Sequence, residues 1–340
     1  MPFFKIGTIG GTPDAYITRD LFEEYKAKYN YPHEGEVMIT CAGTVGKTIV
    51  FDGEDAYFQD SNIVWLSNPK QLYINSFLNY VLSRVNWNIL NSTTITRIYN
   101  DNLRELVINY PSIKEQEKIV ALLSLLDRRI AIQNKVIEDL KKLRCALEER
   151  MLGQCQGKQV RLRDILIERV EKSRINNQYE VLSSTVSGIY SQREYFNKEI
   201  ASADNTGYKA IHRGDVVLSP QNLWMGNINY NDRFEIGIVS PSYKVFSIDE
   251  KFDKGYIAFL LKTRKALWAY SLVSEQGASI VRRNLNYESF LEISFVIPSL
   301  KEQQATARRL SAFKQKQTME EAFLRSLLLQ KEFMLKSLFI

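Results

Sequence analysis

The stretches YPSIKEQEKI, residues 110–119, and IPSLKEQQAT, residues 297–306, are two copies of one motif within a chain of 340 residues. Pro111 and Pro298 lie 187 positions apart, and the Lys-Glu-Gln of each copy has the same spacing from its proline. Proline is favoured in the first turn of a helix, where its missing N–H costs nothing, and the serine after it is a good N-cap. Each motif therefore predicts the start of a helix, at equivalent places in a duplicated chain.

The residues after each motif carry an apolar repeat that alternates in steps of four and three. This heptad pattern is typical of a helix that packs along a second helix as a coiled coil. Polar residues interrupt both repeats at equivalent positions, namely Gln133 and Glu320, and Arg144 and Lys331. Such interruptions fix the register and the partner of a coiled coil. We therefore predict two long helices, over roughly 112–152 and 299–339, that pair with each other; the heptads allow either a parallel or an antiparallel pairing.

The chain also repeats upstream of each helix. EGEVMIT, residues 34–40, parallels RGDVVLS, residues 213–219, and each reads as a turn glycine followed by a strand. Residues 71–87 and 251–268 each have the spacing of an amphipathic helix. A repeat of this size is too long for a solenoid unit. The chain is therefore predicted to hold two copies of a whole domain, each followed by a long helix.

This repeat sets the predicted domain boundaries. The first globular domain is expected over 1–110 and its helix over 111–153, the second domain over 154–297 and its helix over 298–340. The glycines and polar residues after the first helix mark the linker.

The two copies differ at their beginnings. FFKIGTIGG, residues 3–11, aligns with EVLSSTVSG, residues 180–188, so the first copy begins where the second is already 22 residues in. The segment KQVRLRDILIERVEKSRINNQY, residues 158–179, has no counterpart in the first copy. We expect either a reading frame that starts late or a shortened variant, and in both cases an incomplete first domain.

Composition restricts the class of protein. Apolar residues make up 45% and charged residues 25%, which are ordinary values for a soluble globular protein. No segment approaches the roughly 18 uninterrupted apolar residues of a membrane span, and the N-terminus lacks the layout of a signal peptide. The net charge of +6 permits a nucleic-acid partner without establishing one.

Cysteine and histidine are scarce. The three cysteines, Cys41, Cys145 and Cys155, form no Cys-x-x-Cys pair, and His33 and His212 are the only histidines. This pattern argues against a disulfide framework and against a zinc site. We therefore expect a cytoplasmic protein without a structural metal or membrane association.

The stretch CAGTVGKTIV, residues 41–50, is similar to a phosphate-binding loop but departs from it. A Walker A loop needs a glycine five positions before the Gly-Lys-Thr glycine, and Cys41 occupies that position. The loop must also open a helix, whereas the residues that follow are β-branched and aromatic, as in a strand. We predict a strand–turn–strand in which Gly43 and Gly46 shape the turn, and no nucleotide cofactor. An ATP-binding enzyme is the less favoured alternative.

On these residues the chain resembles the specificity (S) subunit of type I restriction–modification systems. Two globular modules, each leading into a Pro-Ser-Ile/Leu-Lys-Glu-Gln helix, are the main likeness. KIGTIGGTPDAYI, GEVMITCAGTVGKTIVFDGEDAYFQDSNIVWL and GDVVLSPQ look like segments of that family's target-recognition domains. The resemblance implies an α+β protein, with two α/β target-recognition domains separated by two long antiparallel coiled-coil helices.

The resemblance also implies a function without an active site. Each recognition domain would read one half of a split, asymmetric site in double-stranded DNA. The helices would set the spacing of the half-sites and dock modification subunits, two of them, which supply adenine N6-methylation with S-adenosylmethionine. Restriction subunits, joined through that complex, would supply ATP-driven translocation and cleavage. A coiled-coil assembly protein with a first module that does not read DNA is the second alternative, left open by the missing segment.

Candidate DNA contacts come from polar loops in both copies. Those of the first copy are Thr44, Lys47, Gln59, Asp60 and Arg97. Those of the second copy are Gln221, Asn222, Trp224, Ser279, Arg282 and Arg283. Lysine and arginine are suited to contact phosphates, and arginine can also read guanine. Glutamine and asparagine can read adenine, and aspartate can accept a hydrogen bond from cytosine. Surface ion pairs and ordinary capped turns explain the same residues equally well. The target bases do not follow from the sequence.

Overall fold

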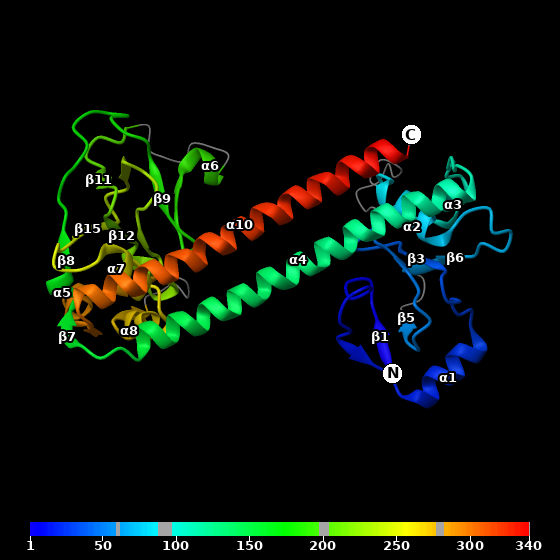
Figure 1. Cartoon of the computed structure of the whole chain (residues 1–340), viewed down its shortest axis with the longest axis horizontal. Coiled ribbons are helices and arrows are strands. Elements are labelled where there is room, and N and C mark those ends of the chain that lie inside the picture. Colours follow the sequence, from blue (N-terminus) through cyan, green and yellow to red (C-terminus); the bar gives the residue numbers. More distant parts are fainter. Residues whose placement is uncertain (59–61, 88–96, 197–203, 277–281, 340) are drawn as a thin grey trace. The chain divides into compact units, whose positions relative to one another are not determined.

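The computed structural model describes the whole chain except residues 59–61, 88–96, 197–203, 277–281 and 340 (Figure 1). The chain divides into two compact units. Unit 1 consists of Met1–Lys135 and Ala322–Ile340, and unit 2 consists of Val136–Glu321. Each unit therefore combines one globular part with a portion of each of two long helices.

The globular part of unit 1 contains small sheets and short helices. Its strands are β1 (Pro2–Phe4), β2 (Ala15–Tyr16), β3 (Val37–Thr40), β4 (Thr48–Val50), β5 (Tyr57–Phe58) and β6 (Ile63–Leu66). Its short helices are α1 (Arg19–Lys28), α2 (Asn75–Arg84) and α3 (Asn100–Arg104). One sheet has the order β4-β3-β6 with antiparallel pairs, and the other has the order β2-β1-β5.

Strand β3 lies at the centre of the unit 1 core. Val37 and Ile39 belong to an apolar cluster that includes Leu82 of α2. Met38, between them in sequence, belongs to a second cluster that includes Phe58. Successive side chains of a strand point to opposite faces, so both faces of this sheet are covered, which explains the continuous apolar run of the sequence here.

The globular part of unit 2 is larger. Its strands are β7 (Lys158–Arg161), β8 (Leu166–Glu168), β9 (Leu182–Ser184), β10 (Ile189–Ser191), β11 (Lys209–His212), β12 (Val216–Leu218), β13 (Ile228–Tyr230), β14 (Ile236–Val239), β15 (Lys244–Ile248), β16 (Ser274–Gln276), β17 (Arg283–Leu285) and β18 (Ser294–Ile297). Its short helices are α5 (Leu162–Ile165), α6 (Gln192–Phe196), the 3-10 helix η1 (Pro220–Met225), α7 (Lys254–Leu260), α8 (Arg264–Leu272) and α9 (Tyr287–Glu292).

Unit 2 repeats the plan of unit 1 with an addition. Strand β12 pairs antiparallel with β13 and β15, as β3 pairs with β4 and β6. The central strands begin at Val37 and Val216, which correspond in the sequence repeat. In unit 2 the sheet continues to β8, giving the order β13-β12-β15-β8. The duplication of the sequence is thus a duplication of the fold.

One expectation for the second copy is wrong in detail. Residues 251–268 were expected to form one amphipathic helix, like α2 in the first copy, but they form α7 and the start of α8. Thr263 interrupts them, because its side chain accepts a hydrogen bond from Ala266 N at 3.2 Å and caps a new helix.

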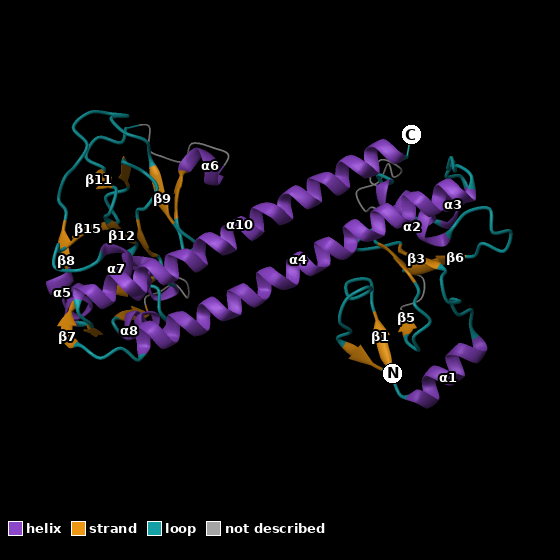
Figure 2. Cartoon of the chain, in the orientation of Figure 1, coloured by secondary structure: helices purple, strands orange, loops and turns teal. Residues whose placement is uncertain are grey.

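The two long helices are α4 (Ile113–Gly153) and α10 (Leu300–Leu338), drawn in purple in Figure 2. The predicted serines, Ser112 and Ser299, directly precede the two helices. Ser112 N and Oγ donate to Glu115 Oε2 at 3.0 and 2.7 Å, and Ser299 makes the same two bonds to Glu302. These hydrogen bonds lower the pKa of both glutamates. No helix in the described part of the chain is long and apolar enough to cross a membrane.

The repeated glutamine ties each long helix to its globular part. Gln116 Nε2 donates to Pro111 O at 2.9 Å, while its Oε1 accepts from the backbone N–H of Ile74 at 2.8 Å. Ile74 is the N-cap of α2 and offers no side-chain cap of its own. Gln303 makes the same contacts, with Pro298 O and with the N–H of Asp253, the N-cap of α7. We call this arrangement, with both glutamines buried, the glutamine clamp.

The long helices pair antiparallel, as predicted. In unit 1, Lys331 near the end of α10 forms an ion pair with Asp127 of α4, and the Arg129 guanidinium lies 5.2 Å from the Phe323 ring centroid. In unit 2, Lys141 of α4 lies 3.7 Å from Glu321 of α10. Residue numbers thus rise along one helix as they fall along the other. Lys331, one of the predicted polar interruptions, acts here through a defined ionic partner.

Candidate nucleic-acid interface

Residues 37–50 form a strand–turn–strand, as predicted, with β3 before the turn and β4 after it. A Walker A loop would be followed by a helix at the position of β4. Gly43 and Gly46 adopt the left-handed φ values of 66° and 81°. A Cβ atom on Gly46 would lie 2.1 Å from Cδ1 of Trp87, so both backbone conformation and close packing require glycine. Because the strand β4, and not a helix, follows this loop, the phosphate-binding geometry is not formed.

Thr44 and Lys47 occupy different surroundings in this loop. Thr44 is exposed, and its carbonyl accepts the hydroxyl of Thr40. Lys47 is half-buried, and its ammonium donates to Ile9 O, which ties the loop to the residues around β1. An ammonium has three donors, so this bond leaves Lys47 able to contact a further acceptor.

Arg97 lies beside the same loop. Its neighbour Ile98 donates its backbone N–H to Cys41 O at 2.9 Å. Burial raises the pKa of the Cys41 thiol, and the charge of Arg97 acts in the opposite direction. The structure therefore brings Arg97 close to Cys41, which begins the stretch that holds Thr44 and Lys47. Gln59 and Asp60 lie outside the described residues.

In unit 2, two distant candidate motifs meet. Gln221, Asn222 and Trp224 lie on η1, and the guanidinium of Arg283, at the start of β17, lies 4.1 Å from the Trp224 ring centroid. This is a cation–π stack, which holds the guanidinium plane in one orientation. Arg282 beside it is exposed, and Ser279 lies outside the described residues.

Two polar atoms of this site are buried without a hydrogen-bond partner among the described residues, Arg283 Nε and Asn222 Oδ1. Buried polar groups are normally satisfied, so both atoms have hydrogen-bonding capacity that no described residue uses. Together with the exposed Arg282, they make the η1–β17 surface the best-formed candidate interface of unit 2.

The sequence did not reveal Lys262, which supports this surface. Its ammonium donates to Gly226 O at 2.8 Å and to Val186 O at 3.2 Å, joining the residue after η1 to the β9–β10 turn. Burial lowers the pKa of Lys262 to about 8. Nothing in the sequence around this lysine predicts that it joins two segments of the chain.

A buried asparagine network, also missed, lies beneath the same turn. Ser184 Oγ donates to Asn227 Oδ1 at 2.7 Å, and Asn229 Nδ2 donates to Ser184 Oγ at 2.7 Å. The sequence run NINYN (227–231) could have indicated this network. It has asparagine at alternate positions, and alternate residues of a strand share one face.

Comparison with known proteins places these features in a family. The family model described as the type I restriction modification DNA specificity domain matches residues 1–142 and 158–327, that is, both copies of the repeat. This chain belongs to that family.

Individual relatives agree with this assignment. A Haemophilus influenzae protein named as a type I restriction enzyme specificity subunit is 48% identical over 140 residues, which is 41% of this chain and 36% of that protein. The match thus spans about a third of the relative's length.

Solved structures share the fold. The type I restriction–modification S subunit from M. genitalium superposes with a TM-score of 0.58 at 19% identity, covering 100% of this chain and 88% of that one. A chain from a structure of complex assembly and conformational transition in a type I restriction–modification system has a TM-score of 0.53 at 13% identity, covering 90% and 82%. The architecture of two α/β domains and two long antiparallel helices is therefore that of the family.

Proposed function

We propose that this chain is the sequence-specific DNA-recognition subunit of a type I restriction–modification complex, with recognition domains at 1–110 and 154–297. The observation that carries the proposal is the duplication itself. Two domains of one plan are each fixed to a long helix by the same glutamine clamp, yet their candidate contact loops differ. Two different modules read two different half-sites, whereas a dimer of one module favours a palindrome.

The proposed DNA contacts divide between the two units. In unit 2, Arg283 stacked on Trp224 is held in a fixed plane, which suits bidentate contact with guanine, and Gln221 and Asn222 suit adenine. Arg282 and Ser279 would complete this surface. In unit 1, the β3–β4 loop with Thr44, Lys47 and Arg97 suits phosphate contacts, and Gln59 and Asp60 stay candidates from the sequence.

The long helices are the proposed docking surface for two modification subunits, with restriction subunits joining through them. Large apolar side chains that stay exposed on α4 and α10 support this: Leu122, Leu125, Ile132, Leu143, Met319, Leu328, Leu329 and Phe333. Exposed apolar residues in such numbers along helices are typical of protein interaction sites. In this proposal the chain is cytoplasmic, has no active site or cofactor of its own, and leaves catalysis to its partners.

Methylome sequencing tests the proposal. Cells expressing the chain together with its modification subunit should methylate adenines at a bipartite, asymmetric site. Deleting one heptad from both helices should shorten the gap between the half-sites by ~10 Å, or about three base pairs, and leave the half-site bases unchanged. Methylation at an altered base sequence with an unaltered gap would contradict the spacer role of the helices.

One observation favours the alternative of an assembly protein that reads DNA with one domain only. Among the described residues, β6 pairs only with β3, whereas in unit 2 the corresponding strand β15 also pairs with β8. In that case the methylome would show a single half-site, set by unit 2, with no base preference on the other side of the gap.

A further inference from the structure

The turn between β9 and β10, residues 185–188, closes a two-stranded antiparallel hairpin in unit 2. Thr185 N donates to Gly188 O at 2.8 Å across this turn. The residues at its tip, Val186 and Ser187, are exposed, and Val186 is 51% exposed. The hairpin therefore presents one apolar and one hydroxyl side chain at its tip.

Side chains from elsewhere in unit 2 hold the backbone of this turn. Thr185 O accepts a hydrogen bond from Asn229 Nδ2 at 2.7 Å. Val186 O accepts a hydrogen bond from Lys262 Nζ at 3.2 Å. The carbonyl groups of the turn are thus fixed from within unit 2, while the side chains at its tip remain exposed.

Buried polar side chains continue this support at the end of β9. Ser184 O accepts from Asn227 Nδ2 at 2.9 Å and from the Tyr243 hydroxyl at 3.2 Å. Ser184, Asn227 and Asn229 are 3%, 4% and 5% exposed, and their side chains bond to one another. Burying polar groups costs stability unless they are hydrogen-bonded, and a satisfied network fixes one geometry. What this network fixes is the base of the turn.

Lys262 also joins the turn to the η1–β17 surface. Its ammonium donates to Gly226 O at 2.8 Å, so Val186 O and Gly226 O both lie within 3.2 Å of the same nitrogen atom. Gly226 is the C-cap of η1. Asn227 gives a second link, because its backbone N–H donates to Asn222 O of η1 at 3.2 Å. The turn is therefore held next to the end of η1.

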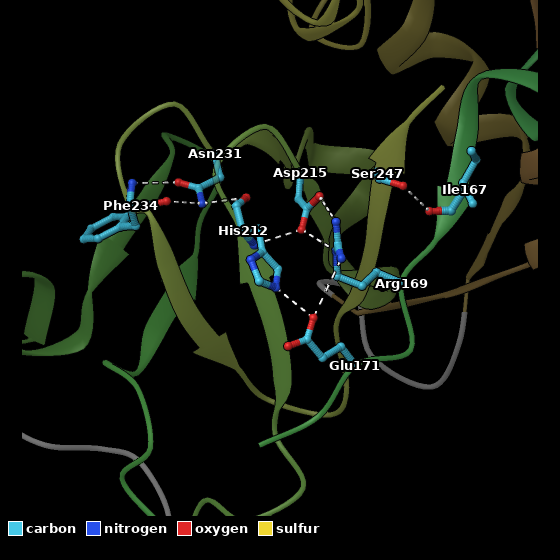
Figure 3. A network of polar contacts seen from close by, with 8 residues as sticks. All are labelled: Ile167, Arg169, Glu171, His212, Asp215, Asn231, Phe234 and Ser247. Carbon is cyan, nitrogen blue, oxygen red and sulfur yellow. Dashed lines mark hydrogen bonds and ion pairs between the residues drawn. The ribbon is translucent and has the colours of Figure 1, made fainter. Parts of the chain in front are cut away.

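The third asparagine of the run 227–231 serves another part of unit 2, as Figure 3 shows. Asn231 Nδ2 donates to His212 O at 2.9 Å and to Phe234 O at 2.8 Å, and its Oδ1 accepts from Phe234 N at 2.9 Å. These bonds hold the turn after β13 and the end of β11. Asn231 is as deeply buried as the other two asparagines, so it offers a matched control for them.

We propose that the β9–β10 turn is a second DNA-reading element of unit 2, beside the η1–β17 surface, and that Lys262 is its positioning residue. This inference rests on the proposed function and deepens it. A two-stranded β-ribbon fits the major groove of DNA, where an apolar side chain can contact the methyl group of thymine. Val186 makes that contact. Reading a single methyl group requires the tip to be held to within about 0.5 Å, which the donors to the carbonyl groups of the turn provide.

Thymine-to-deoxyuridine replacement tests the contact, because it removes only the methyl group. The complex of the full chain with its modification subunit is assayed by competition binding to its methylated site, with each thymine of the unit 2 half-site replaced in turn. At one position the replacement should weaken binding about fourfold, the effect of one methyl group returned to water. Val186→Ala should bind thymine and deoxyuridine equally well at that position. Ser187→Ala, in the same turn, should keep the preference.

Variants of Lys262 test the positioning role. Lys262→Met should lose the same methyl preference, because the turn loses its link to the end of η1. Lys262→Arg keeps a cationic donor and should keep the preference. Asn231→Ala should lower the stability of unit 2, since it removes buried hydrogen bonds, and yet leave the preference at about fourfold. All variants are compared at a temperature at which circular dichroism shows them folded.

Two results would overturn the proposal directly: a half-site in which no thymine responds to replacement, and a response that persists in Val186→Ala. A loss of preference in Asn231→Ala equal to that in Lys262→Met would also overturn it, because the effect would then follow stability. Failure of the proposed function gives a different result, namely no base-specific half-site for unit 2, and the inference would fall with it.

Discussion

Units 1 and 2 are two versions of one design: among the described residues the sheet of unit 1 has the order β4-β3-β6, and that of unit 2 continues to a fourth strand, β8. Both have a central strand between two antiparallel neighbours, and both end in a clamp from the glutamine of a long helix. In unit 2 a further segment adds a strand, two core side chains and the arginine partner of a buried aspartate. The comparison teaches that the three-strand arrangement and the clamp are common to both units, and that residues 158–169 of unit 2 cover strand edges and neutralise the charge of Asp215.

The largest expected effect is an asymmetry between two equivalent carboxylates. Asp215→Ala should lower the free energy of unfolding of unit 2 by about 3–5 kcal/mol, because it leaves Arg169 without its bidentate partner. Glu36→Ala should lower the free energy of unfolding of unit 1 by only about 1 kcal/mol. It removes the acceptor of one hydrogen bond, which comes from the neutral backbone N–H of His33. Hydrogen exchange, followed separately at the amides of β12 and of β3, measures the loss of stability in unit 2 and in unit 1. Equal costs would mean that Glu36 has a cationic partner after all.

Through Lys262, alkaline pH should change the free energy of unfolding of unit 2 and leave that of unit 1 unchanged. Burial lowers the pKa of this lysine to about 8, below its ordinary value of 10.5. The unfolded chain then binds more protons between these values, so the free energy of unfolding of unit 2 should rise as the pH increases from 8 to 10.5, by on the order of 1–3 kcal/mol.

Lys262→Met is the control for this pH effect. The variant should lose the rise, while unit 1, which has Ser83 at the corresponding position, should show none in either protein. Urea unfolding at a series of pH values, followed by hydrogen exchange in each unit, provides the measurement. A rise that persists in the variant would assign it to another group.

The glutamine clamps should be worth the same in both units. Gln116→Ala and Gln303→Ala should each lower the free energy of unfolding by about 1–3 kcal/mol. Each leaves the buried backbone N–H of a helix N-cap residue without an acceptor. The matched replacement by Glu keeps the acceptor but buries a carboxylate against the proline carbonyl oxygen, and should cost more than alanine. A large difference between the two alanine variants, measured by urea unfolding, would show that the duplicated motif has diverged in role.

The smallest expected effect is on DNA. Arg283→Lys keeps the charge and loses the planar guanidinium stacked on Trp224, so it should weaken binding of the preferred half-site by about 1 kcal/mol or more and relax base preference there. Lys47→Ala in unit 1 should weaken binding of all sequences alike and reduce its salt dependence. Competition binding of the assembled complex with randomised half-sites separates the two outcomes. A sequence-independent loss for Arg283→Lys would make Arg283 a phosphate contact.

Residues that act over short distances could be predicted from the sequence. The serines at the starts of α4 and α10, and the glycines of the 41–50 turn, depend on backbone geometry within a few positions. The antiparallel sense of the helices came from the family resemblance, because heptads are the same in both directions. The break between α7 and α8 was not predicted, because Thr263 lies within a helical pattern and its side chain caps a new helix there.

By itself the sequence determined that the chain is duplicated, that each copy ends in a capped long helix, and that the second copy holds a segment without counterpart in the first. These are properties of composition and spacing, which one chain carries along its length. Only the tertiary structure decided that Arg283 stacks on Trp224, that the repeated glutamine caps another helix, and that the unmatched segment pairs with Asp215. These contacts join residues tens of positions apart, and which side chains meet at such separations depends on how strands and helices pack, not on local propensity.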